Sequence, residues 1–224
     1  MKRRIVGLMG SLLLLSVAVP AGADKLSGMP TASEMPFVNA VTADLTARFP
    51  TASDARKAGY VRFTDEDNTG AISYASRQWT SADQQHPSQL WYDVNGRLLG
   101  ADFSVPQADS AQAPSRWGCD PSRWTKFGRH VHYGLNGPNG TTIYGGVGLK
   151  TLETKVPGAD AKHPTPDLLV AAGIAKNVSD VRFVFEFPAI WDLQVWVLPN
   201  PNGAFADSNP DVKPAKGSGM GGMS

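Results

Sequence analysis

The stretch that decides the fold reads LWYDVNGRLLGADF and covers residues 90–103. Two apolar runs flank the Asn-Gly pair at 95–96, and this is the strongest short-range signal for a β-hairpin with a two-residue type I′ turn. Such a turn predicts these cross-strand pairs: Tyr92 with Leu99, and Trp91 with Gly100, whose missing side chain the indole can cover. We therefore expect a fold built around an antiparallel sheet.

Further strands are expected on both sides of this hairpin. Apolar or alternating runs separated by Gly, Pro and Asn predict them at residues 60–63, 71–79, 129–135, 141–149, 182–187 and 191–198. The last run is apolar on both of its faces, which is typical of a central strand.

Three segments have helical patterns. Apolar residues recur every four positions over 36–49, a second helix is expected over 53–58, and Thr165 can cap a third that runs to about residue 176. Strands and helices do not alternate regularly. The sequence therefore predicts an α+β fold, a mostly antiparallel sheet with two or three packed helices, as a single domain over residues 36–212.

The first 23 residues are typical of a secretory signal peptide. Lys2, Arg3 and Arg4 precede an apolar run of about 15 residues, and Ala21-Gly22-Ala23 forms a cleavage site. We expect cleavage after Ala23 and a periplasmic or secreted protein. Residues 24–35 are then expected to be a flexible N-terminal arm, and 213–224 a disordered Gly/Met tail.

Charge and composition exclude some classes of partner. The formal net charge of the chain is +1, and it falls to −2 without the leader because the leader holds three basic residues and no acidic one. No basic footprint for nucleic acid remains. No run after the leader is long and apolar enough to span a membrane. Cys119 is the only cysteine, so no internal disulfide can form, and we expect it to be buried.

Four stretches together resemble a known group of proteins. They are WYDxNGRLLG at 91–100, WGxDPxRW at 117–124, HVHY at 130–133, and WDLQVW at 191–196 followed by NPNGAF and Asn209-Pro210. These stretches are similar to an uncharacterised family of exported bacterial proteins that end in a Trp-rich strand and an NPxGxF…NP loop. The resemblance spans most of the mature chain and implies an architecture, but it assigns no catalytic residue.

His130 and His132 are candidate metal ligands. Residues i and i+2 of a strand point to the same face, so both imidazoles could hold one transition metal, copper or zinc, with Cys119 or His163 as a third ligand. The alternative is a pair of histidines that hydrogen-bond at a sheet surface, and this is the more frequent case.

The acidic loop at 65–70 matches part of an EF-hand calcium loop, through Asp65, Asp67 and Thr69. Ser76 stands where a bidentate glutamate is required, and the flanking segments are predicted strands. An acidic turn is therefore the favoured interpretation.

A third group of residues could bind a ligand. Trp117, Arg123, Trp124 and Tyr133 combine aromatic faces with a guanidinium group in a loop-rich region, which suits sugars or other planar ligands. Such aromatic residues lie in a core more often than in a site.

No catalytic motif is present: the sequence has neither a Gly-x-Ser-x-Gly elbow nor a phosphate-binding glycine loop. Three functions remain open. The favoured one is an exported, non-catalytic ligand-binding or structural module with an unknown small-molecule or protein partner. The first alternative is a periplasmic metal-binding protein that uses His130 and His132. The second is a hydrolase or lyase whose carboxylates, such as Asp102 and Glu186, converge in the fold.

Overall fold

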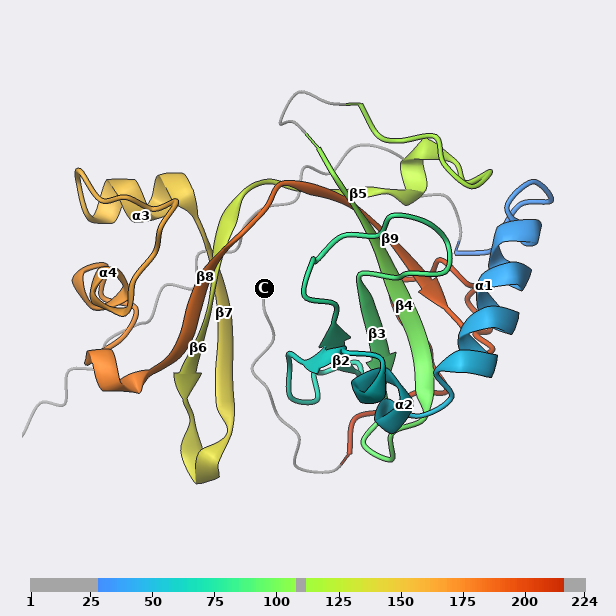
Figure 1. The fold of residues 1–224 in the computed structure, drawn as a ribbon, viewed down its shortest axis with the longest axis horizontal. Coiled ribbons are helices and arrows are strands. Elements are labelled where there is room, and N and C mark those ends of the chain that lie inside the picture. The colour runs from blue at the N-terminus through green and yellow to red at the C-terminus, as the bar shows by residue number, and fades with distance from the viewer. Residues whose placement is uncertain (1–27, 108–111, 216–224) are drawn as a thin grey trace, which may run out of the picture.

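The computed structural model describes residues 28–107 and 112–215, and the other residues, which include the predicted leader and most of the predicted tail, lie outside this description. The described chain forms two antiparallel sheets with four α-helices (Figure 1). The predicted α+β, strand-rich class is therefore confirmed.

The larger sheet has six strands, arranged in the order β1-β2-β3-β4-β9-β5. Every neighbouring pair is antiparallel. The longest pairing joins β4 to β9, so the strand predicted to be central does lie inside the sheet. The strands are β1 (Val61–Arg62), β2 (Ile72–Ala75), β3 (Gln89–Tyr92), β4 (Leu98–Pro106), β5 (Thr125–Phe127) and β9 (Ile190–Trp196).

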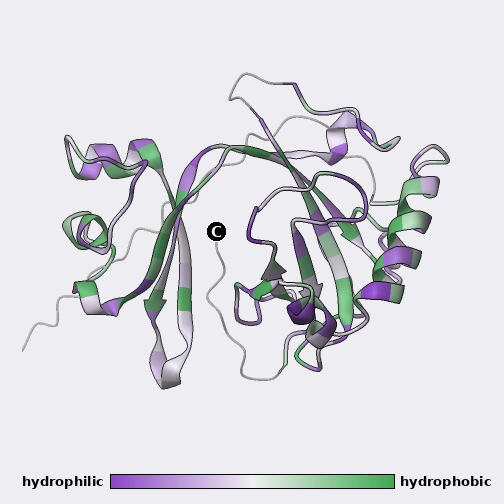
Figure 2. Ribbon diagram, in the orientation of Figure 1, coloured by the Kyte–Doolittle hydropathy of each residue, from purple (hydrophilic) through white to green (hydrophobic). Residues whose placement is uncertain are grey.

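Two helices pack near this sheet. Helix α1 (Met35–Arg48) buries Phe37, Val38, Val41 and Leu45 in the main core, as its apolar spacing predicts. In Figure 2 this helix carries both green (hydrophobic) and purple (hydrophilic) segments. Helix α2 (Ala52–Lys57) begins at Thr51, whose side chain accepts a hydrogen bond from the amide of Asp54. The sheet is therefore covered on one face by helix and loop apolar side chains.

The smaller sheet is inserted between β5 and β9. It has the strand order β7-β6-β8, with β6 (His130–Asn136), β7 (Thr142–Gly148) and β8 (Val181–Phe187). Helices α3 (Leu149–Lys155) and α4 (Pro166–Ala171) supply a separate small core with Val131. Short 3-10 turns complete the chain: η1 (Pro121–Arg123), η2 (Pro138–Gly140) and η3 (Val178–Asp180). We call residues 130–187 the small lobe and the other described residues the large lobe.

One antiparallel ribbon runs through both sheets. Phe127 pairs with Ile190 in the larger sheet, and His130 pairs with Phe187 in the smaller one. Residues 128–129 of one strand and 188–189 of the other separate these two pairs. Because the two intervals are equal in length, the pairing register is the same in both sheets. Pro188 has no amide hydrogen to contribute there, which accounts for the break in the ladder. Figure 1 shows the two strands crossing together between the lobes.

Aromatic rings fill the contact between the lobes. Phe63 and Trp79 extend from loops of the large lobe onto His132, Phe185 and Phe187 of the small lobe. The rings of Trp79 and Phe185 are stacked, and their centroids lie 5.2 Å apart. Trp79 has a φ of 57°, a backbone conformation that is costly for a tryptophan. We call these five residues the aromatic seam.

The central hairpin differs from the prediction in its turn. The amide of Gly96 donates to the carbonyl of Asp93, and Gly96 has a φ of 77°. This is a three-residue turn with a bulge, which the carboxylate of Asp93 stabilises by accepting from the amides of Asn95 and Arg97. The predicted pair of Trp91 with Gly100 is confirmed, whereas the bulge pairs Tyr92 with Leu98 instead of Leu99.

Other boundaries also differ. The strand predicted to end at residue 149 ends at Gly148, and α3 follows at once. The helix predicted to reach residue 176 ends at Ala171, shortly before Gly173 with its φ of 69°. Residues 28–34 of the predicted flexible arm are tied to the large lobe, because the Gly28 carbonyl accepts from Phe205 and Glu34 is buried. Within residues 28–107 and 112–215, no helix is long and apolar enough to cross a membrane.

Candidate binding pocket

The second face of the six-stranded sheet carries polar side chains in its centre. Because alternate residues of a strand point to one face, Asp102 and Ser104 of β4 share this face with Asp192 and Gln194 of β9. Trp91 of β3 lies on the same face, opposite Gly100. This face is thus unlike the apolar face under α1.

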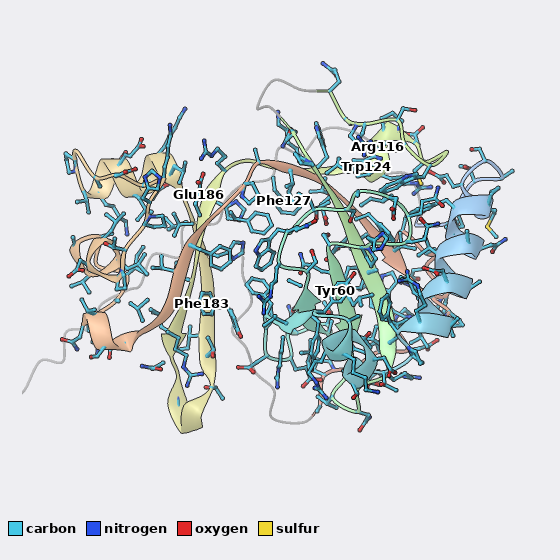
Figure 3. The ribbon with its side chains drawn as sticks, in the orientation of Figure 1. Tyr60, Arg116, Trp124, Phe127, Phe183 and Glu186 are labelled. Atoms are coloured by element: carbon cyan, nitrogen blue, oxygen red, sulfur yellow. The ribbon has the colours of Figure 1, made fainter. Side chains whose placement is uncertain are left out.

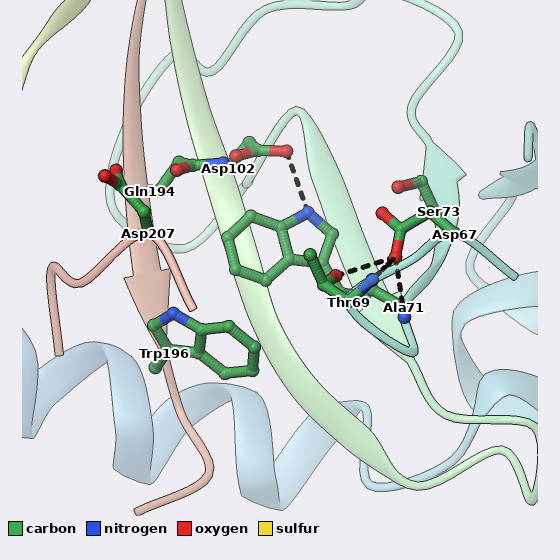
Figure 4. Close-up of a pocket in the computed structure, with 9 residues that line it drawn as sticks. Asp67, Thr69, Ala71, Ser73, Asp102, Gln194, Trp196 and Asp207 are labelled. Atoms are coloured by element: carbon green, nitrogen blue, oxygen red, sulfur yellow. Dashed lines mark hydrogen bonds between the residues drawn. The ribbon is translucent and has the colours of Figure 1, made fainter. Parts of the chain in front are cut away.

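A cavity of about 170 Å³ opens on this face (Figure 4). Strand residues form its floor, the 67–71 loop forms one wall, and Asp207 from the chain after β9 forms another. The lining residues are Asp67, Thr69, Ala71, Ser73, Trp91, Asp102, Gln194, Trp196 and Asp207. The volume is below the usual range for drug-sized ligands, so the cavity suits a small molecule.

Two indole groups support the pocket. The Nε1 of Trp91 donates to the Oδ2 of Asp102 at 2.8 Å, and the Nε1 of Trp196 donates to the carbonyl of Ala206 at 2.7 Å. The two rings meet edge to face, with centroids 5.7 Å apart. These contacts fix both the carboxyl group and the chain segment that closes the pocket.

Asp102 is the most unusual residue of the lining. It is only 5% exposed, and its carboxyl group has the side chains of Trp91, Asp192 and Gln194 as hydrogen-bonding neighbours. Burying a carboxyl group costs free energy, which such hydrogen bonds offset in part. The carboxyl group is therefore held in the wall of the pocket by side chains of the two neighbouring strands, β3 and β9.

A second buried carboxyl group lies beside it. Asp192 is 6% exposed, and the two carboxyl groups are close enough to share a hydrogen bond when one of them is protonated. The hydroxyl of Ser104 donates to the Oδ1 of Asp192 at 2.6 Å, and the hydroxyls of Ser104 and Ser88 lie 2.7 Å apart. A polar chain thus runs from the pocket into the sheet.

Burial and mutual repulsion govern the protonation of this pair. Burial raises the pKa of Asp102 well above its ordinary value, and the neighbouring charge of Asp192 raises it further. Burial also raises the pKa of Asp192, against the hydrogen bond from Ser104. The two carboxyl groups therefore titrate as a coupled pair, and each titration step belongs to the pair.

The predicted ligand residues have structural contacts instead. Trp124 is 4% exposed in the main core, where Trp117 stacks on the ring of Phe37 at 5.4 Å. Arg123 forms a bidentate ion pair with Glu34, with both hydrogen bonds at 3.0 Å. None of these residues lines the pocket over the six-stranded sheet.

Tyr133 belongs to the small lobe. It is half-buried, and its ring lies over Gly145, where a Cβ would come within 2.3 Å of the Tyr133 Cζ. Burial raises the pKa of its hydroxyl. Tyr133 therefore packs on a different sheet from the pocket.

The two predicted metal ligands do point together. The Nε2 atoms of His130 and His132 lie 2.9 Å apart, and the Nδ1 of His130 is 2.7 Å from the carbonyl of Gly128. That carbonyl can only accept, so His130 carries its proton on Nδ1, and its Nε2 accepts from His132. Burial, with the charge of His130, lowers the pKa of His132 to about 3.

A third metal ligand is missing from the described residues, which hold no group of three or more His, Cys, Asp or Glu side chains placed around one ion. Cys119 lies in the core under α1, where burial raises the pKa of its thiol to about 12. His163 contacts Asp160 at an exposed corner of the small lobe. The predicted three-ligand site does not form from these residues.

The acidic loop has three structural roles. The Oδ2 of Asp65 accepts from the amide of Thr142 across the lobe contact, and the Oε1 of Glu66 accepts from the amide of Ala215. The Oδ1 of Asp67 accepts from the amides of Thr69 and Ala71 within its own turn. The carboxylates serve separate partners, and this supports the acidic-turn interpretation over a calcium loop.

The carboxylate pair named from the sequence does not converge. Asp102 lies on β4, whereas Glu186 lies on β8 of the smaller sheet (Figure 3). The carboxylate of Glu186 forms an ion pair with Arg129. The expectation for these two residues was wrong, and Asp192 is the carboxyl neighbour of Asp102. The signal that could have found it is the pair Asp192 and Gln194, two polar residues at i and i+2 in a strand otherwise rich in apolar residues.

No protein-family model, curated protein or solved structure matches this chain. The functional argument therefore depends on the residues of the pocket.

Proposed function

We propose that this chain is an exported, non-catalytic module that binds a small polar ligand in the pocket over the six-stranded sheet. The observation that carries the proposal is the cavity itself, whose wall holds the buried carboxyl group of Asp102 beside the indole of Trp91 and the amide of Gln194. Proteins keep such a costly group where it contacts something else.

The rest of the lining supports a binding role. Trp91 and Trp196 hold the floor in place through their own hydrogen bonds, so the pocket is preformed. Gln194 is exposed and can adjust to a ligand from above. The lining contains neither a nucleophilic Cys or His nor a Lys, which favours binding over chemistry.

A ligand panel tests this function. The full mature protein would be titrated with small amines, amino acids, monosaccharides and carboxylic acids, with tryptophan fluorescence and thermal shift as readouts. The Asp102→Asn variant should lose any response that the native protein gives. The Asp167→Asn variant, with its change on the exposed first turn of α4, is the matched control and should respond fully. A response that survives Asp102→Asn would contradict the proposed site.

Export is proposed from the leader sequence alone. Expression in a bacterial host should give a periplasmic protein whose first residue is Asp24, as measured by intact mass. Replacing Ala21 and Ala23 with large residues should leave the precursor uncut. A cytoplasmic product that retains residues 1–23 would count against export.

Metal binding by His130 and His132 is a second candidate function. The observation that favours it is the convergence of the two Nε2 atoms, because a carbonyl on the opposite nitrogen orients metal-binding histidines in many sites. A thermal shift with copper or zinc that disappears in His130→Ala and in His132→Ala would support it. A lack of bound metal by elemental analysis, together with no shift, would exclude it.

A further inference from the structure

The two histidines of β6 lie beside a bare part of the small sheet. Gly148 pairs with His130 and Gly146 pairs with His132, so these four residues share one face of that sheet. Both glycines are exposed, and a Cβ added to Gly146 would meet no atom closer than the Cδ2 of His130, at 3.6 Å. The imidazoles can therefore be approached over β7, because neither glycine carries a side chain.

The separation of the two Nε2 atoms suits a shared metal ion with an open side. At the usual metal–imidazole distance of about 2.0 Å, a spacing of 2.9 Å gives an N–metal–N angle of about 90°. His132 then carries its proton on Nδ1, as His130 does, so that both Nε2 atoms direct a lone pair at the ion. Two ligands on one side leave the other coordination positions to a further donor.

The sequence beyond the described residues contains donors of a particular kind. Residues 28–107 and 112–215 place no third His, Cys, Asp or Glu around the pair. The stretch that follows, KGSGMGGMS at 216–224, carries the thioethers of Met220 and Met223. Thioether sulfur is a soft ligand that selects Cu(I), whereas zinc favours Cys, His and carboxylate ligands. Two imidazoles with a thioether are thus a donor set for a soft monovalent ion.

The end of the described chain lies within reach of this face. The amide of Ala215 donates to the Oε1 of Glu66 at 2.9 Å. Phe63, three residues before Glu66, packs on the ring of His132, with centroids 5.5 Å apart. These contacts leave Ala215 at most about 30 Å from the imidazole. The eight residues to Met223 span about 27 Å when extended, and the thioether side chain adds to this reach.

On the basis of the metal-binding candidate described above, we propose that the ion is Cu(I) and that a thioether of Met220 or Met223 completes the site. The 216–224 segment passes over the bare glycines of β7, and its own glycines let it lie close to the sheet. His130 and His132 supply two nitrogens, and the methionine supplies sulfur. Binding is a ligation step without electron transfer, and no covalent bond of the protein forms or breaks.

Cu(I) is the probe for the full mature protein, residues 24–224. Its affinity would be measured without oxygen by competition with bicinchoninate, and X-ray absorption at the copper edge would count the nitrogen and sulfur neighbours. The test variant combines Met220→Leu with Met223→Leu and changes no described residue. Met35→Leu is the matched control, because Met35 is an exposed methionine at the start of α1, on the large lobe. Zn(II) is the comparison ion.

The native protein is expected to bind Cu(I) through two nitrogens and one sulfur, and to bind Zn(II) more weakly. The double methionine variant should lose the sulfur neighbour and at least about tenfold in affinity, since even the outer-sphere partners of metal ligands are worth about 10–100-fold. Met35→Leu should behave as the native protein. His130→Ala and His132→Ala should each lose a nitrogen neighbour together with the affinity. The methionine variants leave both lobes unchanged, so they decide the question even where a histidine variant does not fold.

Three results would overturn this assignment, and each also judges the metal-binding candidate. A native site without sulfur, whose affinity the double methionine variant retains in full, would exclude the 216–224 segment and keep the histidine site. Native affinity in both histidine variants would assign the copper to the methionines alone. No binding of Cu(I) by the native protein would reject the segment and the metal-binding candidate together, while the ligand panel still tests the pocket over the six-stranded sheet.

Discussion

Asp102 illustrates how a binding residue can cost stability. Because the pKa values of Asp102 and Asp192 are raised, the folded state binds more protons than the unfolded state above the ordinary carboxyl range. The free energy of unfolding therefore falls as pH rises through this range. The buried pair carries this cost at neutral pH.

We expect Asp102→Asn to stabilise the folded protein at pH 7 by about 1 kcal/mol while it abolishes ligand binding. The asparagine oxygen can accept from Trp91, and its amide can donate to Asp192, so both groups find partners. Urea unfolding at pH 5 and pH 8 measures the effect, which should be larger at pH 8. If the variant were less stable than the native protein at pH 8, the Asp102 carboxyl group would not destabilise the fold.

Glu34 and Arg123 form the opposite kind of buried pair. The side chain of Glu34 is 0% exposed and that of Arg123 is 5% exposed. Burial alone would raise the pKa of Glu34, but hydrogen bonds from Arg123 and from the amides of Thr31 and Asp120 outweigh it, and the pKa falls to about 2. Arg123 also lies over the ring of Phe205, at 4.7 Å. Arg123 thus connects the segment just before α1 to the segment that follows β9.

Arg123→Ala should destabilise the fold by about 3–5 kcal/mol, because it leaves the Glu34 carboxylate buried without its partner. Denaturant unfolding measures this loss. Stability from Glu34 is complete above about pH 4.5 and is lost as the pH falls toward 2. Glu34→Gln should therefore cost stability at pH 6 and much less at pH 2. Equal costs at both pH values would contradict the role of the charge.

At the scale of elements, the close contact between Trp91 and Gly100 fixes the pocket floor. A Cβ at position 100 would lie 2.5 Å from the carbonyl oxygen of Val195 and 2.6 Å from the ring of Trp91. Both β4 and β9 are packed on two faces at this point. The missing side chain is what allows the indole to lie flat beside Asp102.

Gly100→Ala should cost about 2 kcal/mol and displace Trp91 from its hydrogen bond with Asp102. The matched control is Gly128→Ala, where an added Cβ meets nothing within 4 Å. Thermal unfolding and the indole NMR signal of Trp91 provide the measurements. If Gly100→Ala left both the stability and the indole signal unchanged, the close contact between Trp91 and Gly100 would not fix the pocket floor.

Elements with a strong local pattern were predictable from the sequence. The spacing of Phe37, Val41 and Leu45 located α1, and the alternation of Phe183, Phe185 and Phe187 located β8. The predicted partner of Tyr92 was wrong by one residue, because Asp93 stabilises a longer turn than the Asn-Gly pair implies. The pocket over the six-stranded sheet was not predicted. Asp102 could be named, but its partners come from other strands and loops, and only the tertiary pairing of β4 with β9 brings them together.

At the scale of the whole molecule, the small lobe is an insertion whose two ends are adjacent. Phe127 and Ile190 are a cross-strand pair, so a two-residue turn can connect them. The large lobe keeps its own core around α1 without residues 128–189. It loses the aromatic seam and the hydrogen bond from Thr142 to Asp65.

Replacing residues 128–189 with Asn-Gly should leave a large lobe that folds cooperatively, binds the same ligand and is less stable. A second version with Phe63→Thr and Trp79→Gly removes the exposed seam, and the glycine also relieves the positive φ. Amide NMR dispersion and the ligand titration measure the outcome. An unfolded product in both versions would show that the lobes fold only together.

The insertion also sets an order of events during synthesis. Strand β4 leaves the ribosome roughly 90 residues before β9, with which it pairs over its full length in the sheet. At ~5–20 residues per second, this edge of β4 waits ~5–18 s for its partner. An open edge of this length invites pairing with other chains. A nascent chain that is kept extended until it has crossed a membrane escapes that hazard, since β4 and β9 then become available together.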